Sequence, residues 1–163
     1  MGLFDKLFKS NSNITLASPI NGQSLPLSKV SDPTFGEEIL GKGVAIQPEG
    51  NKIVSPCDGV VDLMFDTGHA VNLKSSDGVE ILIHVGLDTV ALKGDGFKTF
   101  KKTDEPVKKG DLLIEFDKDF LLKKGYDIIV PMIICNTDEY KLVKALTDKS
   151  VEAGDDVLVI TKN

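Results

Sequence analysis

Residues 66–90 read DTGHAVNLKSSDGVEILIHVGLDTV, and this stretch contains both histidines of the 163-residue chain, His69 and His84. Asp77-Gly78 lies between them and is a dipeptide typical of tight hairpin turns. The runs on either side mix apolar and polar residues, as half-buried strands do. The stretch therefore predicts a β-hairpin that carries one histidine on each strand.

The length of the hairpin loop decides whether the two histidines share a face, because successive side chains along a strand point to opposite faces. A two-residue turn at Asp77-Gly78 places His84 opposite Val71, so that the imidazoles become diagonal neighbours with Cβ atoms about 7 Å apart. A four-residue loop at 75–78 places them directly opposite each other, and a three-residue loop places them on opposite faces. Two of the three registers therefore place the histidines on one face, and the Asp77-Gly78 signal indicates the first of them, the two-residue turn.

In that register, Val71, Leu73 and Leu82 share the face of the histidines. A neutral imidazole can act as a nucleophile, and a second ring beside it can donate a hydrogen bond or move a proton. The alternative is two incidental histidines. Their place on one hairpin among apolar neighbours favours a functional pair.

Composition limits the classes of function. A net charge of −6 and the absence of arginine argue against a nucleic-acid partner. Cys57 and Cys135 form neither a disulfide framework nor a CxxC metal pair. The chain has no signal peptide and no apolar run long enough for a transmembrane helix, so we expect a soluble, cytoplasmic protein.

Outside the hairpin, short apolar runs separated by turn residues are typical of an all-β domain. The segment 16–22, LASPING, is echoed by 53–59, IVSPCDG, with a shared Ser-Pro-x-(Asn/Asp)-Gly core 37 residues later. We interpret this echo as a duplicated strand-turn-strand motif within one antiparallel β-sandwich or barrel. Further strands are expected at 43–48, 112–116, 128–135 and 156–161.

A few short helical turns are expected between these strands. Asp32 and Pro33 form a typical helix start, in which a capping side chain precedes a proline at the first helical position. A short helix is expected within 118–125. Thr137 is expected to cap a helix that runs to Leu146.

Residues 1–12 are expected to form a flexible or amphipathic N-terminal segment, and residues 13–163 the single domain. In residues 1–10, MGLFDKLFKS, the apolar positions 3, 4, 7 and 8 follow helical spacing, and two lysines lie on the other side. Such a segment is suited to weak contact with a membrane surface. The alternative is a frayed terminus, since an isolated helix of this length is marginal in water.

Metal-dependent hydrolysis is poorly supported by the sequence. A catalytic zinc usually has three protein ligands and a water, whereas His69 and His84 supply two and Asp66 or Asp88 would have to supply the third. The chain has no HxH, HExxH, GxSxG, P-loop or dinucleotide-binding motif. These observations favour chemistry performed by the imidazoles themselves.

The chain also contains the segments MGLFDKL, FGEEILGKGVAIQP, TGHA, VEILIHVGLDTV and LKGDGF, together with the Ser-Pro-x-Asp-Gly turn. Over essentially its whole length it resembles the glucose-type enzyme IIA family of the bacterial phosphoenolpyruvate-dependent sugar phosphotransferase system. The resemblance implies an antiparallel β-sandwich whose active site is a shallow apolar depression with two histidines.

The resemblance also implies roles for individual residues. His84 is expected to be transiently phosphorylated on a ring nitrogen, and His69 to stabilise the phosphoryl group as it moves on. Thr67 and Asp88 match further positions of the family's site. At two positions, Gly68 and Leu82, this chain departs from well-known members of the family. These two departures bear on the choice of partner. The apolar residues expected to contact partners are Phe35, Leu40, Phe65, Leu82 and Val90.

The expected function is that of a phosphocarrier that accepts a phosphoryl group from phospho-HPr and passes it to the IIB domain of a sugar permease, with regulatory target proteins as further partners. No cofactor is expected to be required, although the resemblance allows zinc to bind between His69, His84 and a partner's carboxylate.

Two alternatives remain open. The first is a lipoyl- or biotinyl-type carrier, suggested by the repeated x-Pro-x-x-Gly turns, although the predicted hairpin tip lacks the lysine that such a carrier needs. The second is a pure regulatory binding module.

Overall fold

The computed structural model describes residues 13–163, in which most of the regular structure is antiparallel β-strand. The expected N-terminal segment at 1–12, with its expected membrane contact, lies outside the described residues. The strands are β1 (Asn13–Ala17), β2 (Gly22–Leu25), β3 (Lys42–Pro48), β4 (Lys52–Val54), β5 (Gly59–Met64), β6 (Ala70–Ser75), β7 (Glu80–His84), β8 (Phe97–Thr99), β9 (Pro106–Val107), β10 (Leu112–Phe116), β11 (Val130–Ile134), β12 (Tyr140–Ala145), β13 (Lys149–Val151) and β14 (Asp156–Lys162).

The helices are short, as expected from the sequence. Asp32 accepts a hydrogen bond from the Thr34 amide at 3.0 Å and so caps α2 as predicted. Within residues 13–163, no helix combines the length and the apolar character needed to cross a bilayer. The helices are α2 (Pro33–Gly36), α3 (Lys118–Lys123) and the 3-10 helices η1 (Leu27–Lys29), η2 (Thr89–Leu92) and η3 (Thr137–Glu139).

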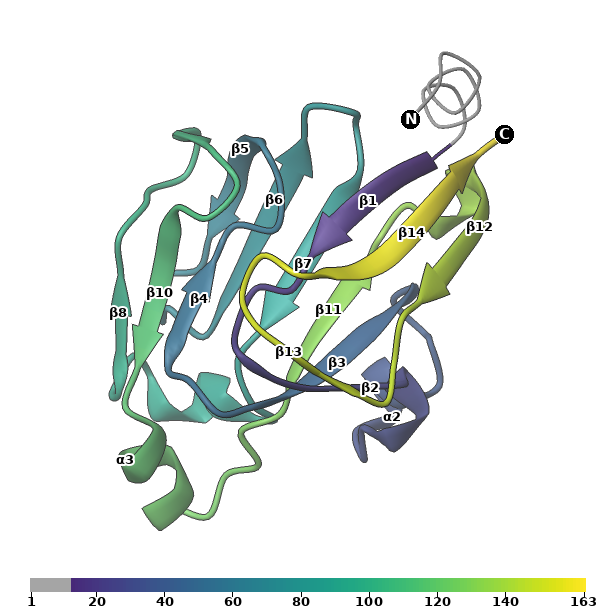
Figure 1. The fold of residues 1–163 in the computed structure, drawn as a ribbon. Coiled ribbons are helices and arrows are strands. Elements are labelled where there is room, and N and C mark those ends of the chain that lie inside the picture. Colours follow the sequence, from purple (N-terminus) through teal and green to yellow (C-terminus); the bar gives the residue numbers. More distant parts are fainter. Residues whose placement is uncertain (1–12) are drawn as a thin grey trace.

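The strands form two layers, and the expected antiparallel β-sandwich is confirmed. One layer is an eight-stranded sheet in the order β13-β2-β3-β11-β7-β6-β5-β9. The other layer consists of two three-stranded sheets, β1-β14-β12 and β4-β10-β8. Figure 1 shows these two small sheets at opposite sides of the molecule, with β1 and β14 in front of the larger sheet.

The main core lies between the two layers. Val71 and Ile83 of the large sheet are fully buried in it, as are Leu16 and Ile114 of the small sheets. A second, smaller cluster lies on the other face of the large sheet, where Ala45 alternates with the main-core residues of β3. The second cluster contains Leu27, Val30, Phe35, Ala45, Leu87, Ile129 and Ile133, with Leu82 packed against it. The large sheet therefore has an outer face that is partly covered by η1 and α2.

The predicted duplication is confirmed by reciprocal hydrogen bonds. The Ala17 amide donates to the Pro56 carbonyl at 3.1 Å, and the Val54 amide, 37 residues after Ala17, donates to the Pro19 carbonyl at 2.8 Å. Each turn is closed in the same way, because a serine hydroxyl donates to the carbonyl two residues later: Ser18 to Ile20 at 2.7 Å and Ser55 to Cys57 at 2.6 Å.

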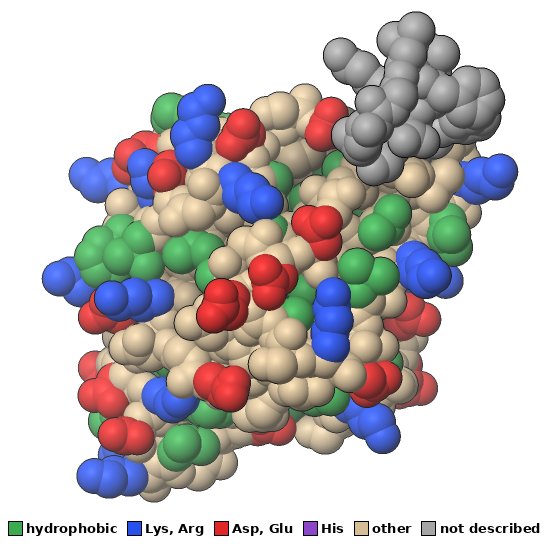
Figure 2. Space-filling view, in the orientation of Figure 1, with side chains coloured by type: hydrophobic (Ala, Val, Ile, Leu, Met, Phe, Trp, Pro, Cys, Tyr) green, Lys and Arg blue, Asp and Glu red, His purple; other side chains and the backbone are tan. Residues whose placement is uncertain are grey.

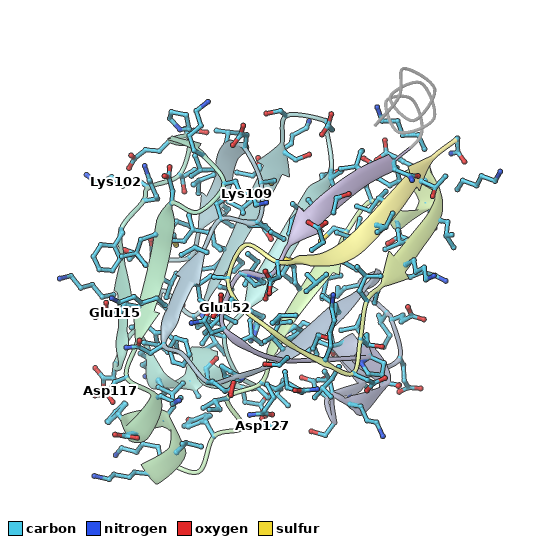
Figure 3. All side chains as sticks on the ribbon, viewed as in Figure 1. Lys102, Lys109, Glu115, Asp117, Asp127 and Glu152 are labelled. Atoms are coloured by element: carbon cyan, nitrogen blue, oxygen red, sulfur yellow. The ribbon has the colours of Figure 1, made fainter. Side chains whose placement is uncertain are left out.

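A second repeated motif, not predicted from the sequence, completes the two halves. The segments 107–111, VKKGD, and 151–155, VEAGD, form matching turns in which the aspartate accepts a hydrogen bond from the amide three residues earlier. The Gly110 amide donates to the Ser55 carbonyl at 2.9 Å, and the Gly154 amide donates to the Ser18 carbonyl at 3.1 Å. Lys109 and Glu152 mark the two turns in Figure 3.

The hairpin register predicted from the sequence is wrong. Lys74 pairs with Glu80 and Ala70 pairs with His84, which leaves a three-residue loop at 76–78. As a result, Val71 and Leu73 point into the main core and do not share the face of His84, whereas Leu82 does.

Tertiary contacts hold this wider loop. The Asn136 side chain donates to the Gly78 carbonyl at 3.1 Å and accepts from the Glu80 amide at 3.0 Å. The Ser76 amide donates to the Asp58 carbonyl at 3.0 Å. Gly78 has a φ of +90°, which suits the last position of a three-residue hairpin loop. The local sequence of the hairpin does not predict these contacts, because Asp58 and Asn136 lie outside it.

The predicted helix from Thr137 to Leu146 is also wrong. Only η3 is helical, and residues 140–145 form β12, which pairs with β14. The Thr137 hydroxyl donates to the Ile134 carbonyl at 2.5 Å and accepts from the Lys42 amide at 3.0 Å, so it ties β3 to β11 and caps no helix. Pairing with β14 overrides the local preference.

The reciprocal turns generate a prediction about stability. Ser18→Ala should lower the free energy of unfolding by about 1–2 kcal/mol, because it removes the hydroxyl donor from a buried carbonyl, and Ser55→Ala should have a similar effect. The two effects should be non-additive, since main-chain hydrogen bonds connect the turns. Urea denaturation measures them, with exposed Ser28→Ala as the control. Full additivity, or losses no larger than that of the control, would contradict the interpretation.

Candidate functional site

His84 is the last residue of β7 and lies on the outer face of the large sheet. Its neighbour Ile83 enters the main core, whereas His84 and Leu82 alternate to the opposite face, beside α2. Figure 2 shows the face of the molecule that carries the small sheets; acidic side chains and lysines are interspersed on it, and neither histidine is visible there. The site therefore opens on a different face of the sandwich.

His69 reaches His84 although the strand register does not predict it. His69 precedes β6, and the chain bends before it at Gly68, where φ is +69° and the Gly68 amide donates to the Phe65 carbonyl at 2.8 Å. The His69 carbonyl accepts from the Val85 amide at 2.7 Å. The two imidazole centroids lie 5.0 Å apart with their planes at 80°. The expected proximity of the histidines is thus confirmed, and it results from this bend and not from the register of the hairpin.

Hydrogen bonds orient both rings. Nδ1 of His84 lies 2.7 Å from the Gly86 carbonyl oxygen. A carbonyl can only accept, so Nδ1 carries the proton and a neutral His84 has its free lone pair on Nε2. The Thr67 hydroxyl is hydrogen-bonded to Nδ1 of His69. Thr67 therefore lies where it can set the orientation of the second ring.

Both rings are neutral near pH 7. Burial, and to a smaller degree the charge of a protonated His84, lower the pKa of His69 from 6.5 to about 4. Burial also lowers the pKa of His84, although its hydrogen bond to Gly86 and the negative charges of Asp32 and Asp88 act in the opposite direction. A neutral imidazole is the form that can act as a nucleophile.

Aromatic side chains border the pair on both sides. The Phe35 ring lies 5.1 Å from that of His84, and the Phe65 ring lies 5.4 Å from that of His69. Phe35 is only 5% exposed, so it packs against His84 from the protein interior and offers little surface to a partner. Leu82 packs beside it in the second cluster.

Two of the apolar residues expected to contact partners are exposed. Val90, on η2, is 54% exposed and Leu40 is 40% exposed. Leu40 lines a hollow with Cys135 and Thr137, and neither histidine lines that hollow.

Sequence reasoning missed two residues at the site, Asp32 and Gly86, and one exposed apolar residue beside Leu40, Ile39. Asp32 was recognised only as a helix cap, although its charge also acts on His84. Gly86 follows His84 by two residues, a spacing that allows its carbonyl to reach back to the ring. Ile39 is 68% exposed, and its position beside Leu40 was the available signal.

The residues present offer two imidazoles to a metal. Across residues 13–163, no group of three or more His, Cys, Asp or Glu side chains is placed to hold a metal ion. Two imidazoles match half of a tetrahedral zinc site, so the remaining ligands would have to come from another molecule.

An antiparallel β-sandwich that holds two neutral imidazoles side by side, flanked by aromatic side chains, has the features of one class of protein, the histidine-based group carrier. The family model described as phosphoenolpyruvate-dependent sugar phosphotransferase system, EIIA 1, matches residues 14–140. The chain belongs to this family.

Individual relatives are similar over most of the chain. The PTS system glucose-specific EIIA component of Haemophilus influenzae is 42% identical over 168 residues, which cover 99% of each protein. The PTS system beta-glucoside-specific EIIBCA component of Dickeya chrysanthemi is 42% identical over 140 residues, which cover 86% of this chain and 22% of that protein. The solved structure of glucose permease IIA from Mycoplasma capricolum matches with a TM-score of 0.83 at 35% identity and covers 98% of this chain and 99% of that one.

The electrostatics of the site generate a prediction about pH. The ring of His69 should titrate with a midpoint near pH 4 in the folded protein, compared with about 6.5 in an unfolded chain. Between these values the unfolded chain binds a proton that the folded chain does not, so the free energy of unfolding should fall as the pH falls from 6.5 to 4. NMR of the ring protons measures the midpoint. The control His69→Gln should lose this part of the pH dependence, and a His69 midpoint at or above 6.5 is the result that refutes the prediction.

Proposed function

We propose that this protein, a phosphocarrier component of the sugar phosphotransferase system, accepts a phosphoryl group from phospho-HPr on Nε2 of His84 and passes it to the IIB domain of a sugar permease. The observation that carries this proposal is the hydrogen bond from Nδ1 of His84 to the Gly86 carbonyl. It leaves Nε2 as the only ring nitrogen of His84 with a free lone pair.

In the proposed transfer, the lone pair of Nε2 attacks phosphorus as the bond to the donor's nitrogen breaks. The leaving nitrogen keeps the electron pair of that bond. No nucleotide or phosphate-cradling loop takes part, so catalysis depends on positioning and on stabilising the charge of the phosphoryl oxygens.

His69 supports this reaction as a hydrogen-bond donor to the phosphoryl group. If the Thr67 hydroxyl donates to Nδ1 of His69, the proton of a neutral ring resides on Nε2 and that N–H is free to donate. The centroid distance of 5.0 Å leaves the two rings close enough to share one phosphoryl group. Thr67 would then select the tautomer of His69.

The surroundings suit a labile phosphohistidine. Phe35 and Phe65 flank the two rings, and an apolar surface limits the access of water to a hydrolysable nitrogen–phosphorus bond. Asp32 and Asp88 raise the basicity of His84 and place negative charge where a cationic partner can dock. Exposed Val90, two residues after Asp88, offers apolar contact area to a partner.

Donor and acceptor must use this surface in turn, because the transferred group occupies one position. A IIB partner is supported by the Dickeya protein, in which the matching segment is one part of an EIIBCA chain. HPr as donor and a cytoplasmic location are parts of the proposal. The equal identity to glucose-specific and β-glucoside-specific relatives means that overall similarity does not select the sugar.

The hairpin loop weakens the lipoyl- or biotinyl-carrier alternative, since residues 76–78 are Ser, Asp and Gly and contain no lysine to modify. Regulatory docking remains compatible with the proposal, because a phosphoryl group on His84 would change the charge of the docking surface.

The roles of the two histidines can be separated by substitution. His84→Gln should abolish phosphoryl acceptance, because it removes the nucleophile. His69→Gln should still accept the group from phospho-HPr and pass it on at least tenfold more slowly, since an amide donates a hydrogen bond but does not move protons as an imidazole does. Labelled phospho-HPr, followed by addition of IIB, measures each step.

Two outcomes would contradict these roles of His84 and His69. Stable label on His84→Gln together with none on His69→Gln would reverse the roles. Unimpaired acceptance by both variants would remove the two-histidine site altogether.

The proposal requires no metal for transfer. Treatment with a chelator should leave the rate of acceptance from phospho-HPr unchanged, because the described residues supply only two ligands. Zinc is expected only to strengthen contact with a partner that adds a carboxylate. Loss of acceptance in chelator that added zinc restores would overturn this part of the proposal.

A further inference from the structure

The two peptide units on either side of Gly86 are each held at both ends. In the first unit, the Val85 carbonyl accepts from the Thr89 hydroxyl at 2.5 Å, and the Gly86 amide donates to the Ile129 carbonyl at 2.9 Å. In the second unit, the Gly86 carbonyl accepts from Nδ1 of His84, and the Leu87 amide donates to the Asp127 carbonyl at 3.0 Å. The direction of the Gly86 carbonyl is therefore determined by the whole segment.

The space around Gly86 excludes a side chain at this position. Its φ is +75°, and a Cβ atom added there would lie 2.7 Å from Cγ2 of Thr89 and 2.8 Å from the Asp127 carbonyl oxygen. Asp127 is itself fixed, because its carboxylate accepts from the Ile129 amide at 3.0 Å. Figure 3 shows Asp127 in the loop that precedes β11.

Thr89 differs from the other residues that hold this segment. Ile129 and Asp127 bind it through main-chain carbonyls, which substitution does not remove, whereas Thr89 binds it through its side chain. Thr89 is fully buried and has no route of its own to a substrate. Its hydroxyl can act on the chemistry only through Val85, Gly86 and then the ring of His84.

We propose that Thr89 is a positioning residue for phosphoryl transfer: its hydroxyl fixes the Val85–Gly86 peptide so that the Gly86 carbonyl holds the proton of His84 on Nδ1 and keeps the lone pair on Nε2. The expected effect of Thr89 on phosphoryl transfer rests on the proposed function. The structural part of the proposal, the tautomer of His84, stands independently of that function.

The test compares Thr89→Val, which keeps the shape and removes the hydroxyl, with Thr89→Ser, which keeps the hydroxyl. Exposed Thr15→Val on β1 is the matched control. Nitrogen-15 NMR of the imidazoles reports the tautomer of His84 without any phosphoryl transfer. In the wild type, Thr15→Val and Thr89→Ser, the ring should be the Nδ1–H form, and in Thr89→Val it should become a mixture of the two tautomers.

The rate of phosphoryl acceptance from phospho-HPr gives the second readout. In Thr89→Val the rate at saturating phospho-HPr should fall roughly twofold with an unchanged KM, because about half of the His84 rings would carry the proton on Nε2 while the docking surface is untouched, and Thr89→Ser should restore it. If Thr89→Val does not fold, Thr89→Ala takes its place in the same comparison.

Three results would overturn the proposal: a wild-type His84 with its proton on Nε2, a Thr89→Val variant with the wild-type tautomer and rate, or a Thr89→Ser variant as impaired as Thr89→Val. A wild-type protein that takes no phosphoryl group from phospho-HPr would instead refute the proposed function. In that case the tautomer measurement still decides the role of Thr89.

Discussion

The chemistry of this site depends on the hydrogen bond between Nδ1 of His84 and the Gly86 carbonyl. Such a bond contributes about 1 kcal/mol net, which is enough to favour one tautomer roughly fivefold. Burial keeps the ring neutral at the same time, so His84 keeps a free lone pair on Nε2, in a ring whose centroid lies 5.0 Å from that of His69. The position of one main-chain carbonyl thus decides which nitrogen of His84 can react.

The sandwich supports the segment that carries this carbonyl. The duplicated turns, each closed by a serine hydroxyl and linked by reciprocal main-chain hydrogen bonds, hold the two small sheets against one face of the large sheet. The main core therefore fills one side of β7, and the other side is left for His84, Leu82 and the aromatic residues around them. Dense packing on the core side is what allows a shallow site on the outer side to keep its geometry.

The sequence predicted the existence of the hairpin, the duplicated turn, the Asp32 cap and the meeting of the histidines. It did not predict the register, because Asn136 and Asp58 select a three-residue loop from distant parts of the chain. In that register the ladder alone would separate the histidines, and only the bend at Gly68 brings them together. The helix expected after Thr137 failed for a related reason, since strand pairing with β14 is a long-range contact. Local patterns identified the two histidines and the family resemblance supplied Thr67 and Asp88, whereas the geometry of the site came from tertiary contacts.

The central claim is that the protein carries the phosphoryl group on one particular atom, Nε2 of His84. The most direct measurement is the position of that group after incubation with phosphoenolpyruvate, enzyme I and HPr, determined by phosphorus–nitrogen coupling in protein with nitrogen-15-labelled histidine. The account predicts a single phosphohistidine in which Nε2 of His84 is bonded to phosphorus and Nδ1 keeps its proton. A phosphoryl group on Nδ1 of His84, or on either nitrogen of His69, would contradict it.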